Sequence, residues 1–353
     1  MAMRQTPLSP RRDTPSPFPF VAMVAQQEMQ LGLLLAATDP LIGGVLILGD
    51  RGTGKSTAVR ALAAVLPPIE VVAGCPYQCP PDQPAGLCPA CTGGAATSKS
   101  KPRAERITVP VVDLPLGATE DRILGALNLE RLMASGEKVF EPGLLAKANR
   151  GFLYIDEINL LEDHLVDLLI DVAASGENRV EREGLSVCHP ARFVLVGSGN
   201  PEEGELRPQL LDRFGLAVEV RTPTDLQQRV EVVRRREAYD RDPAAFVAAQ
   251  AAEQQALQDQ LVAARKRLPK VTLSDEVLAS AAQLCMSLGT DGLRGELSLM
   301  RAAKALAALR NARKATVAHL KEVAPLVLRH RLRRDPLDDT DASQRVMLAL
   351  ESI

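Results

Sequence analysis

The sequence predicts an α/β chain in which a parallel sheet flanked by helices is followed by an all-α region. Up to Pro223, short apolar segments typical of buried strands alternate with helical segments, which is the order that produces a parallel sheet. Beyond Asp225 the sequence contains no strand candidate, and helical periodicity continues to the end of the chain. The 353 residues also exceed the size at which one core usually stops growing, roughly 250–300 residues. We therefore expect two structural units.

The expected strands are short runs of apolar, often β-branched residues bounded by turn residues. In chain order they are 45–48, 107–112, 152–155, 193–196 and 217–220. Charged and apolar residues alternate over 178–192, around Glu183-Gly184, and this pattern predicts a β-hairpin between the third and the fourth of these strands.

The expected helices carry apolar residues at spacings of three and four and end near Pro or Gly. In chain order they are 26–38, 56–66, 120–135, 160–175, an Arg-rich helix to about 239, an Ala- and Gln-rich helix over 244–268, and further helices to the end. Asp39-Pro40 ends the first helix and Pro67-Pro68 ends the second, because a residue before proline is disfavoured in helical conformation.

These elements divide the chain. We expect a flexible arm rich in Pro, Ser and Arg over 1–17, an α/β unit over 18–222, a linker helix over 223–243 and a helical unit over 244–353. Residues 74–104 are rich in Gly and Pro and contain four cysteines and a basic tract, which predicts a loop inserted into the α/β unit.

Composition excludes several function classes. Forty-two Lys and Arg against 44 Asp and Glu give a net charge of −2, so no global field attracts nucleic acid or an anionic membrane. Aromatic residues are 3% and Trp is absent, which argues against a base-stacking surface. The longest apolar stretch, Leu31–Leu48, is interrupted by Asp39-Pro40 and Gly43-Gly44, so we expect no membrane span. The N-terminus lacks the apolar core of a secretory signal, so a reducing compartment is expected.

A phosphate-binding loop is predicted at Gly49–Ser56, which fits the pattern G-x-x-x-x-G-K-[ST]. A chance glycine-rich turn is disfavoured because an apolar strand precedes the loop and a helix follows it, so that backbone N–H groups and the helix dipole face one anion. Lys55 would reach the β- and γ-phosphates, and the Ser56 hydroxyl would ligate Mg²⁺. The expected nucleotide-binding residues are Gly49, Asp50, Arg51, Gly52, Thr53, Gly54, Lys55, Ser56 and Thr57.

Two acids end the expected strand over 152–155. Asp156 suits a contact to the nucleotide-bound Mg²⁺, and Glu157 suits polarisation of an attacking water. The alternative is a pair of ordinary solvated acids at a strand end, which the upstream phosphate loop disfavours.

Three further polar residues would complete a hydrolytic site. Asn200 follows a strand, where its amide would orient the water, although Asn-Pro is also a common turn. Arg213, in Leu-Asp-Arg-Phe, would supply charge to the γ-phosphate of a neighbouring subunit; the alternative is an exposed ion pair with Asp212. Arg294 opens a helix and would also reach phosphate.

The cysteines Cys75, Cys79, Cys88 and Cys91 have the spacing x₃, x₈ and x₂. Four thiolates of this kind close a tetrahedral zinc site in a loop that lacks a core, but the central spacer is shorter than usual for paired ligands. Reduced or redox-responsive thiols are the alternative, and the residues leave both open.

The order of phosphate loop, Asp-Glu strand, strand-end Asn, Leu-Asp-Arg-Phe and helical unit resembles the AAA+ ATPases. Gly117–Asp121, Phe140–Leu145 and Gly151–Asn159 are similar to the helix-2-insert clade of that family, which places such an insert over 117–147. This clade holds chelatases, MoxR-type remodelling ATPases and MCM helicases.

Within the clade, Phe20–Gln26, Asp39–Gly44 and Gly49–Arg60 resemble the small ATPase subunits, subunit I, of magnesium chelatases. The resemblance runs from about Phe18 to Ile353. A MoxR-type remodelling ATPase or a cobalt-chelatase motor is the alternative, and an MCM-like motor is disfavoured by the charge balance.

The resemblance implies an AAA+ P-loop NTPase fold and a role for each site residue. Lys55 and Ser56 belong to Walker A, Asp156 and Glu157 to Walker B; Asn200 is sensor 1, Arg213 the arginine finger and Arg294 the sensor-2 arginine.

It also implies a hexameric ring with MgATP between subunits, whose hydrolysis drives insertion of Mg²⁺ into protoporphyrin IX for chlorophyll or bacteriochlorophyll. The implied partners are a second AAA+ subunit with an integrin-like domain and a larger porphyrin-binding subunit. The implied location is the cytoplasm of a bacterium or the plastid stroma of a phototrophic eukaryote.

Overall fold

A computed structural model describes residues 16–82, 88, 90–91, 103–182, 184–200, 204, 206–332 and 341–353. The arm predicted over 1–17 lies outside this set except for its last two residues. Those two lead into Phe18, whose ring packs on Tyr239 and Phe246 with centroid distances of 5.3 and 5.4 Å. The chain is therefore anchored from residue 16 onward.

The main sheet has five parallel strands in the order β11-β1-β10-β7-β4. The strands are β1 (Val45–Gly49), β4 (Val111–Leu114), β7 (Phe152–Ile155), β10 (Val194–Gly199) and β11 (Leu216–Val220). This confirms the predicted parallel sheet. Because all five strands run in one direction, every carboxyl end lies at one edge of the sheet and every amino end lies at the other.

The strand predicted over 107–112 is wrong as a single element. It divides into β3 (Ala104–Ile107), which pairs antiparallel with β2 (Ile69–Val72) outside the main sheet, and β4. Pro110 lies between them and has no N–H to donate to a ladder, while its carbonyl accepts from the Phe152 N–H at 2.9 Å. The proline thus ends one ladder where the next begins.

The alternating strand residues divide the interior into two cores. Val45 and Ile47 of β1 belong to the core under α1 (Gln27–Thr38) and α2 (Lys55–Val65). Leu46 belongs to the core on the other face, under α4 (Glu120–Leu124), α6 (Leu144–Ala148) and α7 (Asp163–Ser175). Period-two alternation on a sheet covered on both faces explains why these strands read as continuous apolar runs.

The helix predicted over 120–135 is also wrong. Its place is taken by α4, the short strand β5 (Gly125–Leu127) and α5 (Leu129–Ser135), and β5 pairs antiparallel with β6 (Phe140–Pro142). Gly125 has φ of 108°, and a Cβ there would lie 2.6 Å from the Glu141 carbonyl oxygen. The close approach of β6 therefore breaks a segment whose local sequence favours helix.

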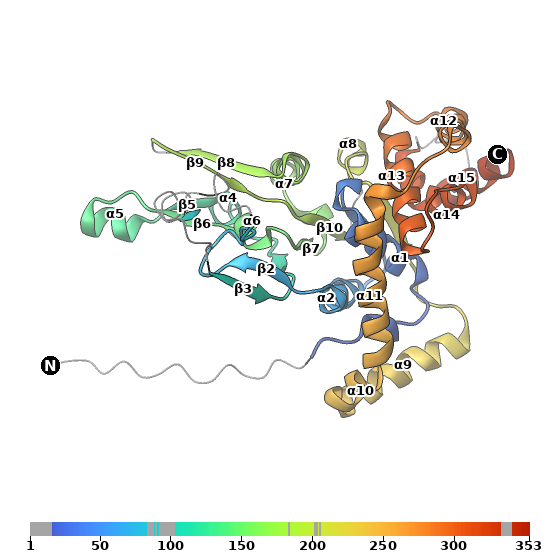
Figure 1. The fold of residues 1–353 in the computed structure, drawn as a ribbon, viewed down its shortest axis with the longest axis horizontal. Coiled ribbons are helices and arrows are strands. Elements are labelled where there is room, and N and C mark those ends of the chain that lie inside the picture. Colours follow the sequence, from blue (N-terminus) through green and yellow to red (C-terminus); the bar gives the residue numbers. More distant parts are fainter. Residues whose placement is uncertain are drawn as a thin grey trace.

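The predicted hairpin is confirmed as β8 (Glu177–Arg182) and β9 (Leu185–Pro190). It projects from the sheet in the same direction as α5, away from the C-terminal helices (Figure 1). After β10, the short helix α8 (Pro208–Leu211) leads into β11.

The C-terminal region is helical, as predicted. Its helices are α9 (Leu226–Arg241), α10 (Pro243–Ala249), α11 (Ala251–Arg267), α12 (Asp275–Leu288), α13 (Arg294–Leu309), α14 (Val317–Leu328) and α15 (Ala342–Glu351). Short 3₁₀ turns lie at Phe20–Ala22, Pro40–Ile42, Ile158–Leu160, Leu268–Lys270 and Arg329–Arg331. The helix predicted over 244–268 is divided between α10 and α11 at Gln250.

The helical region does not have a core of its own. Leu299 and Leu306 of α13 and Leu320 of α14 belong to the same continuous core as β1 and α1. Figure 1 shows α11, α13 and α14 stacked beside α1 at one end of the sheet. None of the helices in the described ranges is both long and apolar enough to cross a bilayer.

Candidate active site

The phosphate loop connects β1 to α2 with the geometry that an anion cradle needs. Gly52 and Gly54 have φ of 77° and 84°, in the left-handed region, and a Cβ on either would meet no atom within 4 Å. The Lys55 Nζ donates to the carbonyl oxygens of Gly49 at 2.5 Å and Asp50 at 3.0 Å. The ammonium therefore lies over a loop that encloses open space, and the residues present fit a nucleotide phosphate group.

Asp156 follows β7 at the same edge of the sheet and is held in place by two neutral donors. One of its carboxylate oxygens accepts from the Tyr154 hydroxyl at 2.9 Å and from the Ser198 hydroxyl at 2.6 Å. Burial raises the pKa of Tyr154, so the phenol stays protonated at neutral pH and can donate. The carboxylate itself is exposed, as a ligand for Mg²⁺ must be.

The sequence analysis missed both donors. Tyr154 lies two residues before Asp156 and Ser198 two before Asn200, so in each strand the pair shares one face of the sheet. That spacing was the available signal.

Glu157 lies in the left-handed region at φ of 55°, which is uncommon for a residue with a Cβ. Its N–H donates to the Ser198 hydroxyl at 3.2 Å, and its carboxylate pairs with Arg51 of the phosphate loop at 3.5 Å. A hydrogen-bonded backbone thus aims this side chain at the phosphate loop and not along the strand.

Asn200 follows β10, the strand between β1 and β7. Residue pairing sets Gly199 beside Leu48 and Gly197 beside Ile155, so Asn200 lies between the phosphate loop and the two acids. Its side chain is buried. The crevice outside the carboxyl ends of parallel strands is the usual ligand site of such sheets.

Asn159 is a second amide at this edge that the sequence analysis did not identify. Its side-chain oxygen lies 3.4 Å from a Cβ built on Gly199, and both polar atoms of its amide are buried without a hydrogen-bond partner among the described residues. A buried amide without a partner lowers the stability of the fold, and a functional role is one explanation for keeping it.

Arg213 lies at the opposite edge of the sheet. It precedes the amino end of β11, where the Gly215 N–H donates to the Gly43 carbonyl at 3.2 Å before β1 begins. Its guanidinium pairs with Asp171 near the end of α7. The alternative partner considered from the sequence, Asp212, is therefore wrong.

Arg294 opens α13 and lies at the same amino edge as Arg213. Its guanidinium binds Asp212 at 2.8 Å. Arg331, which is almost fully buried, donates to Asp212 at 2.5 Å and to the Phe214 carbonyl at 2.7 Å, so the helical region holds the loop that carries Arg213. Arg331 could not be singled out from the sequence, because the basic run 329–334 does not show which of its arginines is buried.

One chain does not bring these arginines to its own phosphate loop. β1 and β11 each run for five residues between the two edges, and a strand rises about 3.3 Å per residue, or roughly 16 Å for each of them. Arg213 and Arg294 therefore lie about a strand length from the phosphate loop of the same chain.

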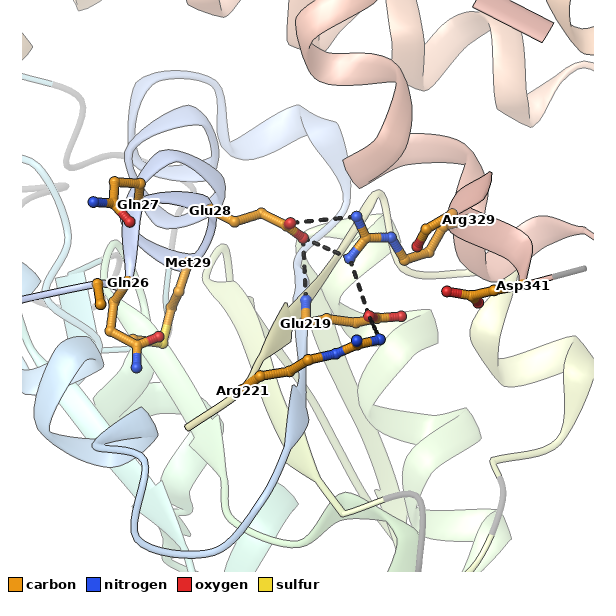
Figure 2. Close-up of a pocket in the computed structure, with 10 residues that line it drawn as sticks. Gln26, Gln27, Glu28, Met29, Glu219, Arg221, Arg329 and Asp341 are labelled. Atoms are coloured by element: carbon orange, nitrogen blue, oxygen red, sulfur yellow. Dashed lines mark hydrogen bonds and ion pairs between the residues drawn. The ribbon is translucent and has the colours of Figure 1, made fainter. Parts of the chain in front are cut away.

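A cavity of about 410 Å³ lies between the start of α1, the end of β11 and the C-terminal helices, and Figure 2 shows residues that line it. Across it, Arg329 binds Glu28 at 2.6 Å and lies 3.9 Å from Glu219. The cavity adjoins the phosphate loop, because Gln26 on its wall donates to the Thr53 carbonyl at 3.5 Å.

The four cysteines Cys75, Cys79, Cys88 and Cys91 come together away from this site, with all four sulfur atoms within 4.8 Å of one another. Burial raises the pKa of Cys79 and raises that of Cys91 to about 12. The histidines His164, His189, His319 and His330 do not join them or one another.

Comparison with known proteins places these features in a family. A family model described as magnesium chelatase, subunit ChlI, matches residues 129–209, and a model of AAA lid domains matches residues 278–348. The magnesium-chelatase 38 kDa subunit of Acidiphilium rubrum is 64% identical over 336 residues, covering 95% of this chain and 97% of the relative. That of Rhodobacter capsulatus is 59% identical, covering 95% and 93%. The magnesium-chelatase subunit ChlI of a Nostoc species is 52% identical, covering 97% and 90%.

Solved structures agree. A 7.5 Å cryo-EM model of the complex between subunits BchI and BchD of magnesium chelatase shares 56% identity, with a TM-score of 0.54 over 94% of this chain and 100% of that chain. A candidate ATPase from Cytophaga hutchinsonii has a TM-score of 0.62 at 17% identity, covering 95% and 92%, and shows the fold alone.

Proposed function

This chain belongs to the family of magnesium-chelatase 38 kDa subunits, also named ChlI, and on that premise we propose how it works as the AAA+ ATPase subunit of a magnesium chelatase. Its ATP hydrolysis drives insertion of Mg²⁺ into protoporphyrin IX, in the formation of chlorophyll or bacteriochlorophyll. Mg²⁺ gives up its hydration water reluctantly, which is a physical reason to couple the insertion to ATP. One observation carries the mechanism: the two halves of a hydrolytic site lie at opposite edges of one sheet.

The carboxyl edge supplies the half that binds nucleotide. The proposed binding residues are Gly49, Asp50, Arg51, Gly52, Thr53, Gly54, Lys55, Ser56 and Thr57. Ser56 and Asp156 would hold the Mg²⁺ that accompanies ATP, which when bound neutralises phosphate charge. Glu157 accepts a proton from the attacking water, and Asn200 orients that water between the phosphate loop and the acids. Tyr154 and Ser198 are positioning residues that fix Asp156.

The amino edge supplies the half that acts on a neighbour. Arg213 would reach the γ-phosphate bound by the adjacent subunit, and Arg294 would accompany it from the same edge. Developing charge on the transferred phosphoryl group is what such arginines stabilise. A head-to-tail contact of this kind makes a ring when its rotation closes, and the resemblance to the AAA+ ATPases implies a ring of six subunits.

We further propose that the chain works as the units 18–222 and 244–353, joined by a linker helix over 223–243. Their shared core holds the arginines at a fixed place relative to the phosphate loop of the same chain. A change at one nucleotide is therefore passed to the arginines that serve the next.

The proposed partners are a second AAA+ subunit with an integrin-like domain and a large subunit that binds porphyrin. The similarity to a chain solved in a BchI–BchD complex supports the first of these. The proposed cofactors are MgATP at the phosphate loop and, as a separate structural metal, zinc at the four cysteines. The proposed location is the cytoplasm of a bacterium, or the plastid stroma for a phototrophic eukaryote; the free state of all described cysteines fits either reducing compartment.

Reconstitution tests this function. The purified chain is mixed with the other two chelatase subunits, ATP, Mg²⁺ and protoporphyrin IX, and Mg-porphyrin fluorescence is recorded beside phosphate release. We expect product only when all three subunits and ATP are present. Phosphate release that DNA stimulates, with no metallated porphyrin, would reject the proposal.

Lys55→Ala is the matched negative control, because it removes the ammonium that lies over the phosphate loop. We expect it to lose nucleotide binding, measured with a fluorescent ATP analogue, and therefore all product. Lys147→Ala, on the exposed side of α6, should bind and react normally.

A further inference from the structure

The four-cysteine cluster, Cys75, Cys79, Cys88 and Cys91, has the dimensions of a metal site. The sulfur of Cys75 lies 3.7 Å from that of Cys88 and 3.5 Å from that of Cys91. Four sulfurs at about 2.3 Å from a tetrahedral zinc ion are about 3.8 Å from one another. A disulfide would need about 2.05 Å. The separations thus match zinc ligation and not paired cystines.

The backbone around the sulfurs also suits thiolate ligands. The Cys91 N–H donates to the Cys88 sulfur at 3.3 Å. Backbone donors aimed at sulfur stabilise negative charge there and orient the ligand toward a metal.

The described residues of this loop enclose only a small apolar core. Its separate small core consists of Tyr77, Cys79, Cys88, Cys91 and Ala146. Three of these five buried residues are the cysteines themselves. A loop with so small an apolar core needs a cross-link to be stable, and a structural metal ion is a common one.

We infer that this chain binds one zinc ion through Cys75, Cys79, Cys88 and Cys91. The loop that carries these four cysteines, once fixed by zinc, holds the β8–β9 hairpin against the insert over 117–147. The inference stands apart from the nucleotide chemistry, which uses none of these residues.

The brace runs through Tyr77, which lies between two of the ligands. Its ring stacks on His189 of β9 with centroids 4.6 Å apart, and its carbonyl accepts from the Asn149 amide at 2.6 Å. His189 contacts Asn178 of β8 at 3.0 Å, and Asn178 donates to the Leu124 carbonyl at the end of α4 at 2.9 Å. His189, Asn178 and Asn149 are all buried. A loop fixed by zinc therefore fixes the base of the hairpin and the start of the insert together.

Metal analysis tests the site. The full chain, purified with a phosphine reductant and without chelator, should contain about one zinc per chain by mass spectrometry of the metal. A Cys88→Ser/Cys91→Ser variant should contain none, while Cys188→Ser, at an exposed cysteine of the hairpin, should keep its zinc. Cobalt added to the metal-free chain should give the ligand-field absorption of a tetrahedral thiolate complex.

Failure of the wild-type chain to retain or take up zinc, or its recovery with a disulfide among these cysteines, would overturn the site. Because zinc is also removed from the wild type with a chelator, this test does not depend on whether the variant folds. Nucleotide binding measured on the same samples separates loss of the zinc site from failure of the ATPase proposal.

Hydrogen exchange tests the brace. Zinc removal should speed amide exchange in 177–190 and 125–142, and leave α12–α15 unchanged. His189→Ala should keep zinc yet speed exchange in the hairpin roughly 2- to 10-fold, the worth of one aromatic stack. His164→Ala, at an exposed histidine, is its control. Unchanged hairpin exchange after zinc removal would overturn the brace.

Discussion

The two edges of the sheet hold their functional side chains in different ways. At the carboxyl edge, Asp156 is fixed by neutral hydroxyl donors from buried residues. At the amino edge, Arg213 forms an ion pair with Asp171, whose side chain is 71% exposed. Arg294, whose side chain is 58% exposed, forms one with Asp212. Exposed ion pairs contribute only about 0–1 kcal/mol, so exchanging them for a phosphate costs little. One edge is assembled within the subunit, whereas in the proposed function the arginines of the other edge act on the nucleotide of a neighbouring subunit.

The largest test of this contrast is Arg213→Ala. Loss of an arginine finger lowers turnover by roughly 10³- to 10⁵-fold, and nucleotide binding should be unchanged because the phosphate loop lies at the other edge. ATP hydrolysis and binding of a fluorescent ATP analogue measure the two quantities separately.

Mixing sharpens the same test. When Arg213→Ala, which keeps Glu157, is mixed with Glu157→Gln, which keeps Arg213, part of the activity should return, because some interfaces then join an intact acid to an intact arginine. Two variants that stay inactive when mixed, or a monomer that hydrolyses ATP at full rate, would contradict action between subunits. Arg207→Ala, an exposed arginine near α8, is the matched control.

Glu157→Gln tests the carboxyl edge alone. The amide keeps the size of the side chain but cannot accept a proton, so turnover should fall roughly 10²- to 10⁴-fold while ATP still binds. Normal hydrolysis would remove Glu157 from its proposed role.

Ser198→Ala asks how much the positioning of Asp156 contributes. Losing the 2.6 Å hydrogen bond should raise the Mg²⁺ concentration that gives half-maximal hydrolysis roughly 10- to 100-fold, the usual effect of removing a group that orients a metal ligand. A titration of turnover against Mg²⁺ measures this. Ser287→Ala, at the end of α12, should leave the titration unchanged.

The smallest effect concerns His330, which lies beside Arg331 and contacts the Phe214 carbonyl at the amino edge. Burial and the nearby Arg331 lower the pKa of His330 from its ordinary 6.5 to about 3. The unfolded chain therefore binds a proton between these values that the folded chain does not. The free energy of unfolding should fall as the pH drops below 6.5, by at most about 1.4 kcal/mol per pH unit from this group. Denaturant unfolding of His330→Gln between pH 7 and 5 should show a flatter slope; an equal slope would contradict it.

The sequence predicted best where one local pattern decides the structure. The phosphate loop needs only consecutive residues, and the main strands are recognised by apolar runs between turns. The predictions over 120–135 and 107–112 were wrong because contacts with distant residues determine the secondary structure there. β6 approaches Gly125 closely, and Pro110 ends one strand ladder beside Phe152. Ser198 was missed because it matters only through its contact with Asp156, at the end of the neighbouring strand.

By itself, the sequence determined the parallel sheet, the phosphate loop and the identity of the acids and arginines, since each is encoded in adjacent residues or simple periodicity. Tertiary structure alone decided that Arg213 and Arg294 lie a full strand length from their own phosphate loop, that Asp212 binds Arg294 and Arg331, and that four cysteines meet. The physical reason is that contacts between distant residues depend on how elements pack, and packing is not encoded in any single segment.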